Sequence, residues 1–302
     1  MNSANPAEAR VNTGIKTWST PVKPEEKRPI PCTLCGGFRF KASLSCEGFS
    51  YVRCTACGLV QINPQPLKEE IIRRYNQGKE YLSYELANEE AYLKLQLLAL
   101  EDTRFGDLER ELLSGSKPRV LDIGCATGKL LSRFRDRGWE TVGVEISALQ
   151  AEYGKRERKL DIRSLFLEDN HFSSSSFDVI LASHLAEHLN DPASMIREVR
   201  RILTPGGRFF ITTPNMAGFQ ARIFGSRWRS AIFDHLYLFS AKTLSRMIVE
   251  AGFTIEKTVT WGGLAAGTVP APVKHLFDKA AKRFGFGDVM IIRSIKNNEN
   301  EV

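Results

Sequence analysis

The chain has 302 residues, of which 42% are hydrophobic and 25% are charged, and its formal net charge is +7. This composition suits a soluble globular protein with one main domain and room for a smaller one. It excludes a membrane-spanning helix, because no apolar stretch reaches the roughly 18 to 20 residues that such a helix needs.

The first segment, residues 1–28, is rich in Asn, Ser, Thr, Pro and Lys, and we predict a disordered tail there. It lacks the basic and then apolar pattern of a secretion signal. Further along, basic residues concentrate at 133–137, 155–159 and 197–229. We interpret them as solvated helix faces. The alternative is attraction to an anionic partner, such as RNA, a nucleotide-linked sugar or a membrane surface.

Two Cys-x-x-Cys-Gly segments follow the tail. Cys32 and Cys35 form the first pair, Cys54 and Cys57 form the second, and 18 residues separate the pairs. This is the spacing of a structural zinc site with four thiolate ligands, so we predict a zinc ribbon over residues 29–64. Redox cysteines or two disulfides are the alternatives, but a redox motif needs only one such pair beside a βαβ pattern. Free thiolates imply a reducing compartment, and we therefore expect a cytoplasmic protein.

A helical segment is predicted after the ribbon, at residues 65–116. Pro66 fits the first turn of a helix at 67–75. Leucines at helical spacing predict one long helix at 84–113. The segment would link the ribbon to the following domain.

A glycine-containing turn connects the next two predicted strands. The sequence RVLDIGCATGK at residues 119–129 is an apolar strand that ends in a turn with Gly124 and Gly128, and a helical pattern follows. Glu145, 23 residues after Asp122, ends the second apolar strand. This is the layout of a nucleoside-binding βαβ unit, in which the second acid can accept both ribose hydroxyls. The acid at Asp122 would repel a pyrophosphate and suits a cationic or zwitterionic ligand.

This turn resembles motif I of the class I S-adenosylmethionine (SAM) methyltransferases, which reads D-x-G-x-G-x-G and has Ala126 here in place of the middle glycine. The segments FDVILASHLAEHLNDP at 177–192 and RILTPGGRFFITTPN at 201–215 resemble the fourth and fifth strands of that family with their adjoining helices. The resemblance covers roughly residues 80–296. It implies an α/β fold with a Rossmann-like, mostly parallel sheet whose last strand is antiparallel, over residues 117–302.

Strands and helices alternate along this region, which predicts a parallel sheet with helices on both faces. The segment 65–116 resembles the lid helices that precede motif I in small-molecule methyltransferases. Residues 215–240 form an insertion, and insertions at this place shape the acceptor pocket in the family. The uncharged run 258–273 is rich in glycine and proline and is interpreted as a loop. The expected strands are 119–123, 140–145, 161–166, 177–182, 207–213, 253–260 and 288–296, and the expected helices are 128–137, 147–158, 191–203 and 241–251.

The resemblance also implies where SAM would bind. Asp122 and Gly124 would contact its methionine part, and Gly128 would leave space at the start of the helix. Glu145 would bind the ribose. Cys125 fits beside the ligand as a small residue, an interpretation that we favour over a nucleophile. The full expected set is Asp122, Gly124, Cys125, Gly128, Glu145, Leu167, Glu168 and Ser183, with Leu167 and Glu168 at the adenine.

Candidate catalytic residues lie after the fourth strand and in the insertion, and they are His184, Glu187, His188 and His235. His184 and His188 share a face if this stretch is helical. The pattern resembles metal-dependent O-methyltransferases, in which Glu-x-x-Glu-His holds a divalent ion. Because His184 replaces the first Glu, we favour a metal-free histidine base, and a second divalent ion at these residues stays open. The structural alternative is a local cap formed by Glu187 and His188.

The ribbon followed by this SAM domain resembles bacterial methyltransferases of sugar, polysaccharide and small-metabolite pathways. It implies a SAM-dependent methyltransferase that acts on a small-molecule or glycan acceptor, such as a nucleotide-linked sugar, with oxygen as the favoured methylated atom. One alternative is an RNA methyltransferase whose ribbon docks RNA, which the positive charge favours and the scarcity of interleaved basic and aromatic residues in the ribbon disfavours. The other alternative is a SAM-binding scaffold without catalysis.

Overall fold

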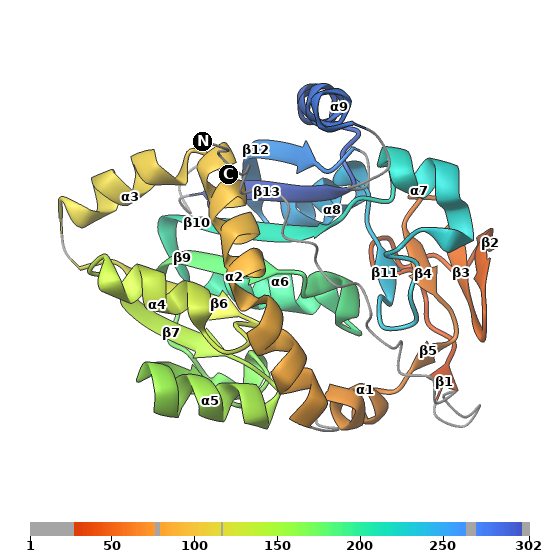
Figure 1. Cartoon of the computed structure of the whole chain (residues 1–302). Helices are drawn as coiled ribbons and strands as arrows, with labels where there is room; N and C mark the ends of the chain where they lie inside the picture. Colours follow the sequence, from red (N-terminus) through yellow and green to blue (C-terminus); the bar gives the residue numbers. More distant parts are fainter. Residues whose placement is uncertain (1–26, 76–78, 116, 264–269, 298–302) are drawn as a thin grey trace.

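A seven-stranded sheet forms the centre of the protein in the computed structural model, which describes residues 27–75, 79–115, 117–263 and 270–297. Its strand order is β12-β13-β10-β9-β6-β7-β8 (Figure 1). The strands from β10 to β8 run parallel, whereas β13 runs antiparallel to both β10 and β12. The predicted Rossmann-like α/β fold is thus confirmed. The strands are β6 (Arg119–Ile123), β7 (Glu140–Val144), β8 (Asp161–Arg163), β9 (Phe177–Ser183), β10 (Leu203–Pro214), β12 (Phe253–Trp261) and β13 (Val289–Lys296).

Helices cover both faces of this sheet, as the alternation of elements predicts. Figure 1 shows α2 and α4 in front of the sheet and α6 and α8 behind it. Within the described ranges, none of the helices combines the length and the apolar composition needed to cross a bilayer. The helices are α1 (Lys68–Tyr75), α2 (Lys79–Asp102), α3 (Phe105–Leu113), α4 (Lys129–Asp136), α5 (Ala148–Arg158), α6 (Pro192–Ile202), α7 (Phe219–Phe224), α8 (Ala241–Glu250) and α9 (Ala271–Phe284).

The core has two parts, one on each face of the sheet. Successive strand residues point to opposite faces, so the neighbours Val120 and Leu121 belong to separate buried clusters. Leu121 shares its cluster with Ile196 of α6 and Leu244 of α8. Val120 shares the other with Phe134 of α4. Because helices bury both faces of the sheet, the strand sequences are continuous apolar runs.

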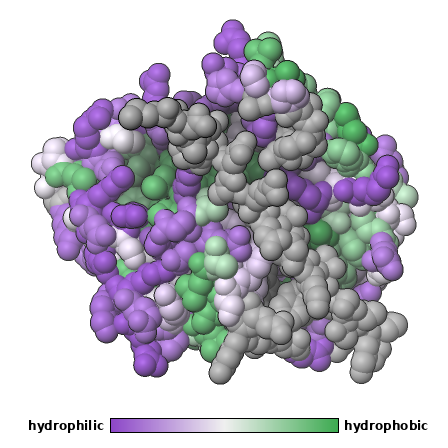
Figure 2. Space-filling view, in the orientation of Figure 1, coloured by the Kyte–Doolittle hydropathy of each residue, from purple (hydrophilic) through white to green (hydrophobic). Residues whose placement is uncertain are grey.

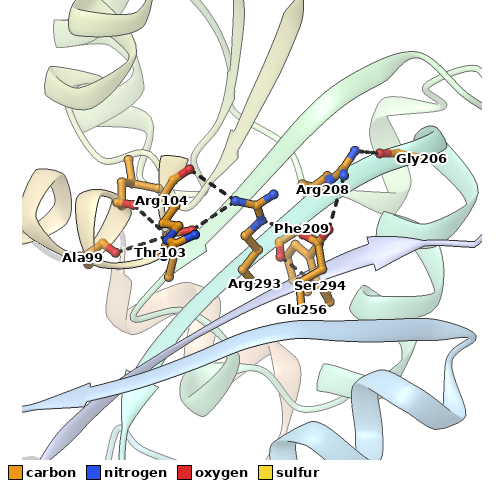
Figure 3. A network of polar contacts seen from close by, with 10 residues as sticks. Ala99, Thr103, Arg104, Gly206, Arg208, Phe209, Glu256, Arg293 and Ser294 are labelled. Carbon is orange, nitrogen blue, oxygen red and sulfur yellow. Dashed lines mark hydrogen bonds and ion pairs between the residues drawn. The ribbon is translucent and has the colours of Figure 1, made fainter. Parts of the chain in front are cut away.

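The single long helix expected at 84–113 is in fact two helices, α2 and α3. The chain turns between them at Arg104, which has a φ of 59°. Figure 3 shows Arg293 of β13 donating to the carbonyls of Thr103, at 3.0 Å, and Arg104, at 3.3 Å, while it also pairs with Glu256. These bonds fix the turn to the sheet. They are tertiary contacts, so leucine spacing gave no sign of the break.

Other expected boundaries also change. β8 ends at Arg163 rather than at residue 166. Part of the loop expected at 258–273 is regular, because β12 continues to Trp261 and α9 begins at Ala271, while residues 264–269 lie outside the described part. Phe277 fixes α9 by packing on the ring of Phe219, with the centroids 4.9 Å apart.

The outer surfaces differ in polarity along the chain. Figure 2 shows hydrophilic side chains over α4 and α5, and hydrophobic ones over α9 and α7. Leu276, Phe284 and Ile223 of α9 and α7 are among the exposed large apolar residues. The solvated helix faces expected for basic residues fit the α4 and α5 side.

The ribbon forms a second, four-stranded antiparallel sheet with the order β11-β4-β3-β2. Its strand β11 (Tyr237–Leu238) comes from the insertion rather than from the predicted ribbon. Residues 1–26 of the expected tail lie outside the described part, whereas Lys27–Arg28 is not tail but strand β1, paired with β5 (Gln65–Pro66). The other ribbon strands are β2 (Phe40–Cys46), β3 (Phe49–Cys54) and β4 (Val60–Ile62).

Candidate functional site

The predicted cofactor residues gather where β6 and β7 end. Asp122 of β6 pairs with Gly143 of β7, and Glu145 directly follows β7. Parallel strands place their carboxyl ends at one edge of a sheet, so both acids lie beside the turn that joins β6 to α4. Both are buried, with 2% of Asp122 and 7% of Glu145 exposed.

The turn between β6 and α4 has three residues in the left-handed region, namely Gly124 (φ 74°), Ala126 (φ 50°) and Gly128 (φ 75°). Alanine costs roughly 1 kcal/mol there, whereas glycine enters freely. The Ala126 amide donates to Glu145 Oε2 at 2.9 Å, and the Ser147 amide donates to Oε1 at 2.8 Å. These bonds hold the carboxylate against the turn and offset the strain at Ala126.

Close packing surrounds the turn. A Cβ on Gly128 would lie 2.5 Å from Leu160 Cδ1, and a Cβ on Gly143 would lie 2.6 Å from Cys125 Sγ. Burial raises the pKa of the Cys125 thiol well above its ordinary value, and the two nearby carboxylates raise it further. The thiol therefore stays protonated, which supports a packing role for Cys125.

The remaining predicted cofactor residues lie at the same edge of the sheet. Leu167 and Glu168 follow β8 at the short helix η2 (Glu168–Asn170), where Leu167 is buried and Glu168 is exposed. Ser183 is the last residue of β9 and is half-buried. All eight predicted residues thus lie at or just beyond the carboxyl ends of β6 to β9, where open α/β sheets bind ligands.

Asp122 is expected to make stability fall as the pH rises. Burial, assisted by Glu145, raises its pKa from 3.8 to about 8. The folded protein therefore retains a proton that the unfolded chain releases between these values. The contribution of Asp122 to stability is present in full below pH 4 and is lost as the pH rises towards 8, by at most about 1.4 kcal/mol per pH unit. Urea unfolding at pH 5, 6, 7 and 8 should show a shallower decline for Asp122→Asn than for the wild type.

The control for this measurement is Asp161→Asn, because Asp161 is an exposed acid at the start of β8. Its pH profile should follow that of the wild type. Identical profiles for Asp122→Asn and the wild type would show that Asp122 ionises normally in the fold.

Glu85 and Glu89 of α2 lie near the turn and were not predicted from the sequence. Glu89 forms an ion pair with Arg158 and accepts a hydrogen bond from Thr127 Oγ1 at 3.3 Å. Burial, assisted by Glu145 and Glu89, raises the pKa of Glu85 to about 7. Helix α2 therefore lies across the turn. The available signal was their i, i+4 spacing, which places both acids on one face of the helix.

A second group of polar residues lies after β9. Glu187 and His188 belong to the short helix η3 (Ala186–His188), and His235 comes from the insertion. One ligand atom from each of the three lies within 4.8 Å of the others. The rings of His188 and His235 meet edge to face, with their centroids 4.7 Å apart. The loop after β9 also reaches the first group, because a Cβ on Gly124 would lie 3.3 Å from Leu185.

Backbone carbonyls orient both histidines. His188 Nδ1 lies 2.9 Å from the carbonyl oxygen of Asp234, and His235 Nδ1 lies 2.8 Å from that of Ser230. A carbonyl only accepts hydrogen bonds, so each neutral ring carries its proton on Nδ1 and has its lone pair on Nε2. Burial, followed by the charge of His188, lowers the pKa of His235 to about 3. His235 thus stays neutral at physiological pH.

Glu187 is a buried carboxylate with 1% of its surface exposed. It accepts a hydrogen bond from Thr213 Oγ1 at 2.9 Å and lies 3.2 Å from His184 Nδ1. Burial would raise its pKa, but His184 and the other two histidines lower it to about 2. His184 itself is exposed, has a φ of 51° and lies outside a helix. The condition under which His184 and His188 would share a helix face is therefore not met.

The four predicted zinc ligands converge at one end of the ribbon. Cys32 Sγ lies 3.4 Å from Cys57 Sγ, Cys35 Sγ lies 3.5 Å from Cys54 Sγ, and all four sulfurs lie within 4.8 Å of one another. Tetrahedral zinc with bonds of about 2.3 Å would place sulfurs about 3.8 Å apart. The spacing of the four sulfurs therefore fits a zinc ion with four thiolate ligands.

Backbone amides lower the thiol pKa values at this group, although burial leaves the pKa values of Cys32 and Cys57 above their ordinary value. Burial would raise the pKa of Cys54, but the amides of Cys57 and Ala56, together with the neighbouring thiols, lower it to about 7. Gly36 and Gly58 close the two turns with φ values of 70° and 82°. The two turns have the same hydrogen bond, because the Gly36 amide donates to the Cys32 carbonyl at 2.7 Å and the Gly58 amide donates to the Cys54 carbonyl at 3.0 Å.

Comparisons with known proteins identify a domain within the chain. A family model for a methyltransferase domain matches residues 91–258. Curated relatives include the "Probable S-adenosylmethionine-dependent methyltransferase" of Mycolicibacterium smegmatis, 31% identical over 143 residues. The ubiquinone biosynthesis O-methyltransferase of Pseudomonas aeruginosa is 33% identical over 113 residues. The matches cover 46% and 35% of this chain and 53% and 48% of those relatives, so the chain spans about half the length of the curated relatives it matches.

A solved structure agrees with the fold. The "possible histamine N-methyltransferase" of Thermotoga maritima matches with a TM-score of 0.55 and 23% identity. The match covers 76% of this chain and 99% of that one. At this identity the similarity concerns the fold alone.

Proposed function

The chain belongs to the methyltransferase-domain family, and from this premise we propose that it transfers the methyl group of SAM to a hydroxyl of a small-molecule or glycan acceptor. One observation carries the proposal. The acidic residues at the ends of β6 and β7 and the paired histidines after β9 lie at the same edge of the sheet, so a donor site and an acceptor site would adjoin.

The donor site would use the predicted residues in the roles that their positions allow. Glu145 would exchange its hydrogen bond from the Ala126 amide for the ribose hydroxyls. Asp122 and the turn at Gly124 would hold the methionine part, and Leu167 would pack at the adenine beside Glu168. Bound SAM supplies an electrophilic methyl group carried by a sulfonium. The protein must then hold the acceptor in line with that methyl group.

The acceptor site would use the histidine pair. An attacking hydroxyl has to lose its proton, and a neutral histidine nitrogen within hydrogen-bond reach can accept it. We assign this acceptance to Nε2 of His188. Because His235 stays neutral at physiological pH, we assign it the role of orienting the acceptor, by accepting a hydrogen bond from a second hydroxyl beside the attacking one. Glu187 would orient the pair through its charge, and His184 would keep Glu187 ionised.

Replacing His235 by Ala is expected to reduce methyl transfer at least 100-fold and to leave SAM affinity within about twofold. The acceptor would lose a hydrogen-bonding group that orients it, whereas the donor residues would keep their places. The measurements are kcat with a saturating acceptor and SAM binding by calorimetry. The matched control is His275→Ala, because His275 is exposed on α9. Equal turnover in the two variants would remove His235 from the mechanism.

The histidine pair could instead bind a divalent metal ion together with Glu187. Glu187, His188 and His235 offer one oxygen and two imidazole nitrogens, a set that suits zinc, iron or manganese better than magnesium. Metal analysis separates this use from a metal-free base. One metal equivalent per chain, unchanged in His235→Ala, supports the metal-free base. Two equivalents, with one lost in His235→Ala, support the ion.

We also propose that Cys32, Cys35, Cys54 and Cys57 hold a structural zinc ion. Four thiolates leave no open coordination position, so this ion would stabilise the ribbon without taking part in methyl transfer. The close approach of the four sulfurs and the amides directed at them support this assignment.

The acceptor can be identified by mass spectrometry of cell extract incubated with the purified chain and methyl-deuterated SAM. We expect the label in a small metabolite or glycan precursor. Label confined to RNA would replace this proposal by an RNA methyltransferase, and total RNA should then bind the chain in a salt-dependent manner. Tight SAM binding without label in any fraction would indicate a SAM-binding scaffold.

A further inference from the structure

The ribbon holds the segment that carries His235. Strand β11 pairs with β4, so that Tyr237 lies opposite Gln61, and the amide of Ile62 donates to the carbonyl of Leu236 at 2.8 Å. The ribbon thus contributes backbone hydrogen bonds immediately after His235. The family match begins at residue 91 and does not include β2 to β4.

Side chains of the ribbon contact the same segment before His235. The ring of Phe49 meets that of Phe233 edge to face, with the centroids 5.6 Å apart. Cys46 Sγ lies 3.8 Å from the carbonyl oxygens of Ser226 and Ala231. The ribbon therefore flanks the His235 turn from both sides.

Tyr51 is the central contact between the two parts. Its side chain is fully buried, and its hydroxyl lies 2.7 Å from the carbonyl oxygen of Ile232 and 2.8 Å from that of His235. Burial raises the pKa of Tyr51 well above its ordinary value, so the hydroxyl remains a donor. The His235 amide also donates to the Ile232 carbonyl, at 3.1 Å. The Tyr51 hydroxyl therefore forms a bifurcated hydrogen bond to the carbonyls at both ends of the turn from 232 to 235.

We propose that Tyr51 is a positioning residue through which the four-cysteine ribbon holds His235 opposite His188. The inference rests on the proposed function, in which His235 orients the acceptor. Tyr51 does not touch the acceptor itself. It fixes the backbone from which the His235 ring extends, while the Ser230 carbonyl fixes the ring.

Strand β3 connects Tyr51 to the cysteine group, so metal binding by the cysteines can affect the position of Tyr51. Tyr51 and Cys54 lie three residues apart on that strand. The strand continues into the cysteine turn, where the Cys54 amide bonds the Leu59 carbonyl at 2.9 Å. Loss of the metal would release this end of β3, and the hydroxyl of Tyr51 would no longer be held at the turn. The ribbon would thus couple metal occupancy to the acceptor side.

The experiment is NMR of the histidine rings in the full chain labelled with ¹⁵N-histidine. The chain has five histidines, and two of them, His171 and His275, are exposed and take no part in the ribbon contacts named above, so they are internal references. Tyr51→Phe removes one oxygen atom and keeps the ring. We expect the His235 ring signals to shift or broaden, because the Nδ1 bond to Ser230 becomes partly occupied, while the references stay in place.

The control variant is Ser50→Ala, which removes an exposed hydroxyl from the neighbouring position of β3. It should leave all ring signals unchanged. Metal removal from the wild type by a chelator should shift the His235 signals in the same direction as Tyr51→Phe. SAM affinity should stay within about twofold in both cases, because the turn at Gly124 is unchanged.

Turnover of the acceptor identified by labelling is expected to fall about tenfold in Tyr51→Phe. That corresponds to one lost buried hydrogen bond. Unchanged His235 signals in Tyr51→Phe would overturn the positioning role, whatever the turnover. Shifted signals with wild-type turnover would instead overturn the role of His235 in the proposed function and leave the positioning by Tyr51 in place.

Discussion

Replacing Glu145 by Ala is expected to weaken SAM binding on the order of 100-fold. Two hydroxyls of the ribose would lose a charged acceptor, and hydrogen bonds to a charged group contribute about 1.5 to 3 kcal/mol each. The Ser147 amide already holds the carboxylate at the turn, so only the hydrogen bond from the Ala126 amide has to be exchanged when the ribose binds. Isothermal titration calorimetry with SAM measures the effect directly.

The matched control is Glu140→Ala at the other end of β7. Glu140 is exposed and pairs with Arg119, far along the strand from the turn. Its SAM affinity should equal that of the wild type. An affinity of Glu145→Ala within threefold of the wild type, with an intact circular dichroism spectrum, would remove Glu145 from the donor site.

Replacing Cys54 by Ser is expected to remove one zinc equivalent from the chain and to unfold the ribbon. A serine hydroxyl is not a thiolate, and structural zinc contributes about 10 to 16 kcal/mol of apparent binding free energy in small zinc domains. The ribbon shares its buried cluster with α6 and α8, so the main domain should melt at a lower temperature as well. Metal analysis and thermal unfolding measure the two effects.

Cys46→Ser is the control for this variant. Cys46 is a free thiol of β2 that contacts carbonyls of the insertion and lies outside the group of four. It should keep the full metal content. Unchanged zinc content in Cys54→Ser would show that the four cysteines do not hold the metal.

The sequence predicted the elements that local patterns define. Apolar runs interrupted by Gly124 and Gly128 gave the strand, turn and helix at 119–137 with boundaries that shift by only one residue. The spacing of the cysteine pairs gave the group of four, because two short turns fix all four sulfurs. The helix break at Arg104 could not be predicted, since it depends on Arg293, nearly 200 residues away.

The candidate site shows the same division. Asp122 and Glu145 were predictable because each ends a strand of one βαβ unit. The partner of His188 was harder to define, because His235 reaches it from an insertion 47 residues further along the chain. The spacing of His184 and His188 would have put them on one face of a helix, but the backbone at His184 is left-handed and not part of a helix.

The sequence by itself determined the class of fold, the turn at the donor edge and the four-cysteine group. Each of these depends on hydrophobic periodicity or on residues within one supersecondary unit. Only the tertiary structure decided that β11 completes the ribbon sheet and that Tyr51 closes the turn at His235. The physical reason is the distance along the chain. The Tyr51 hydroxyl bonds carbonyls about 180 residues away, and β11 pairs with a strand of the ribbon far from it in sequence. Such hydrogen bonds leave no periodic pattern in the sequence.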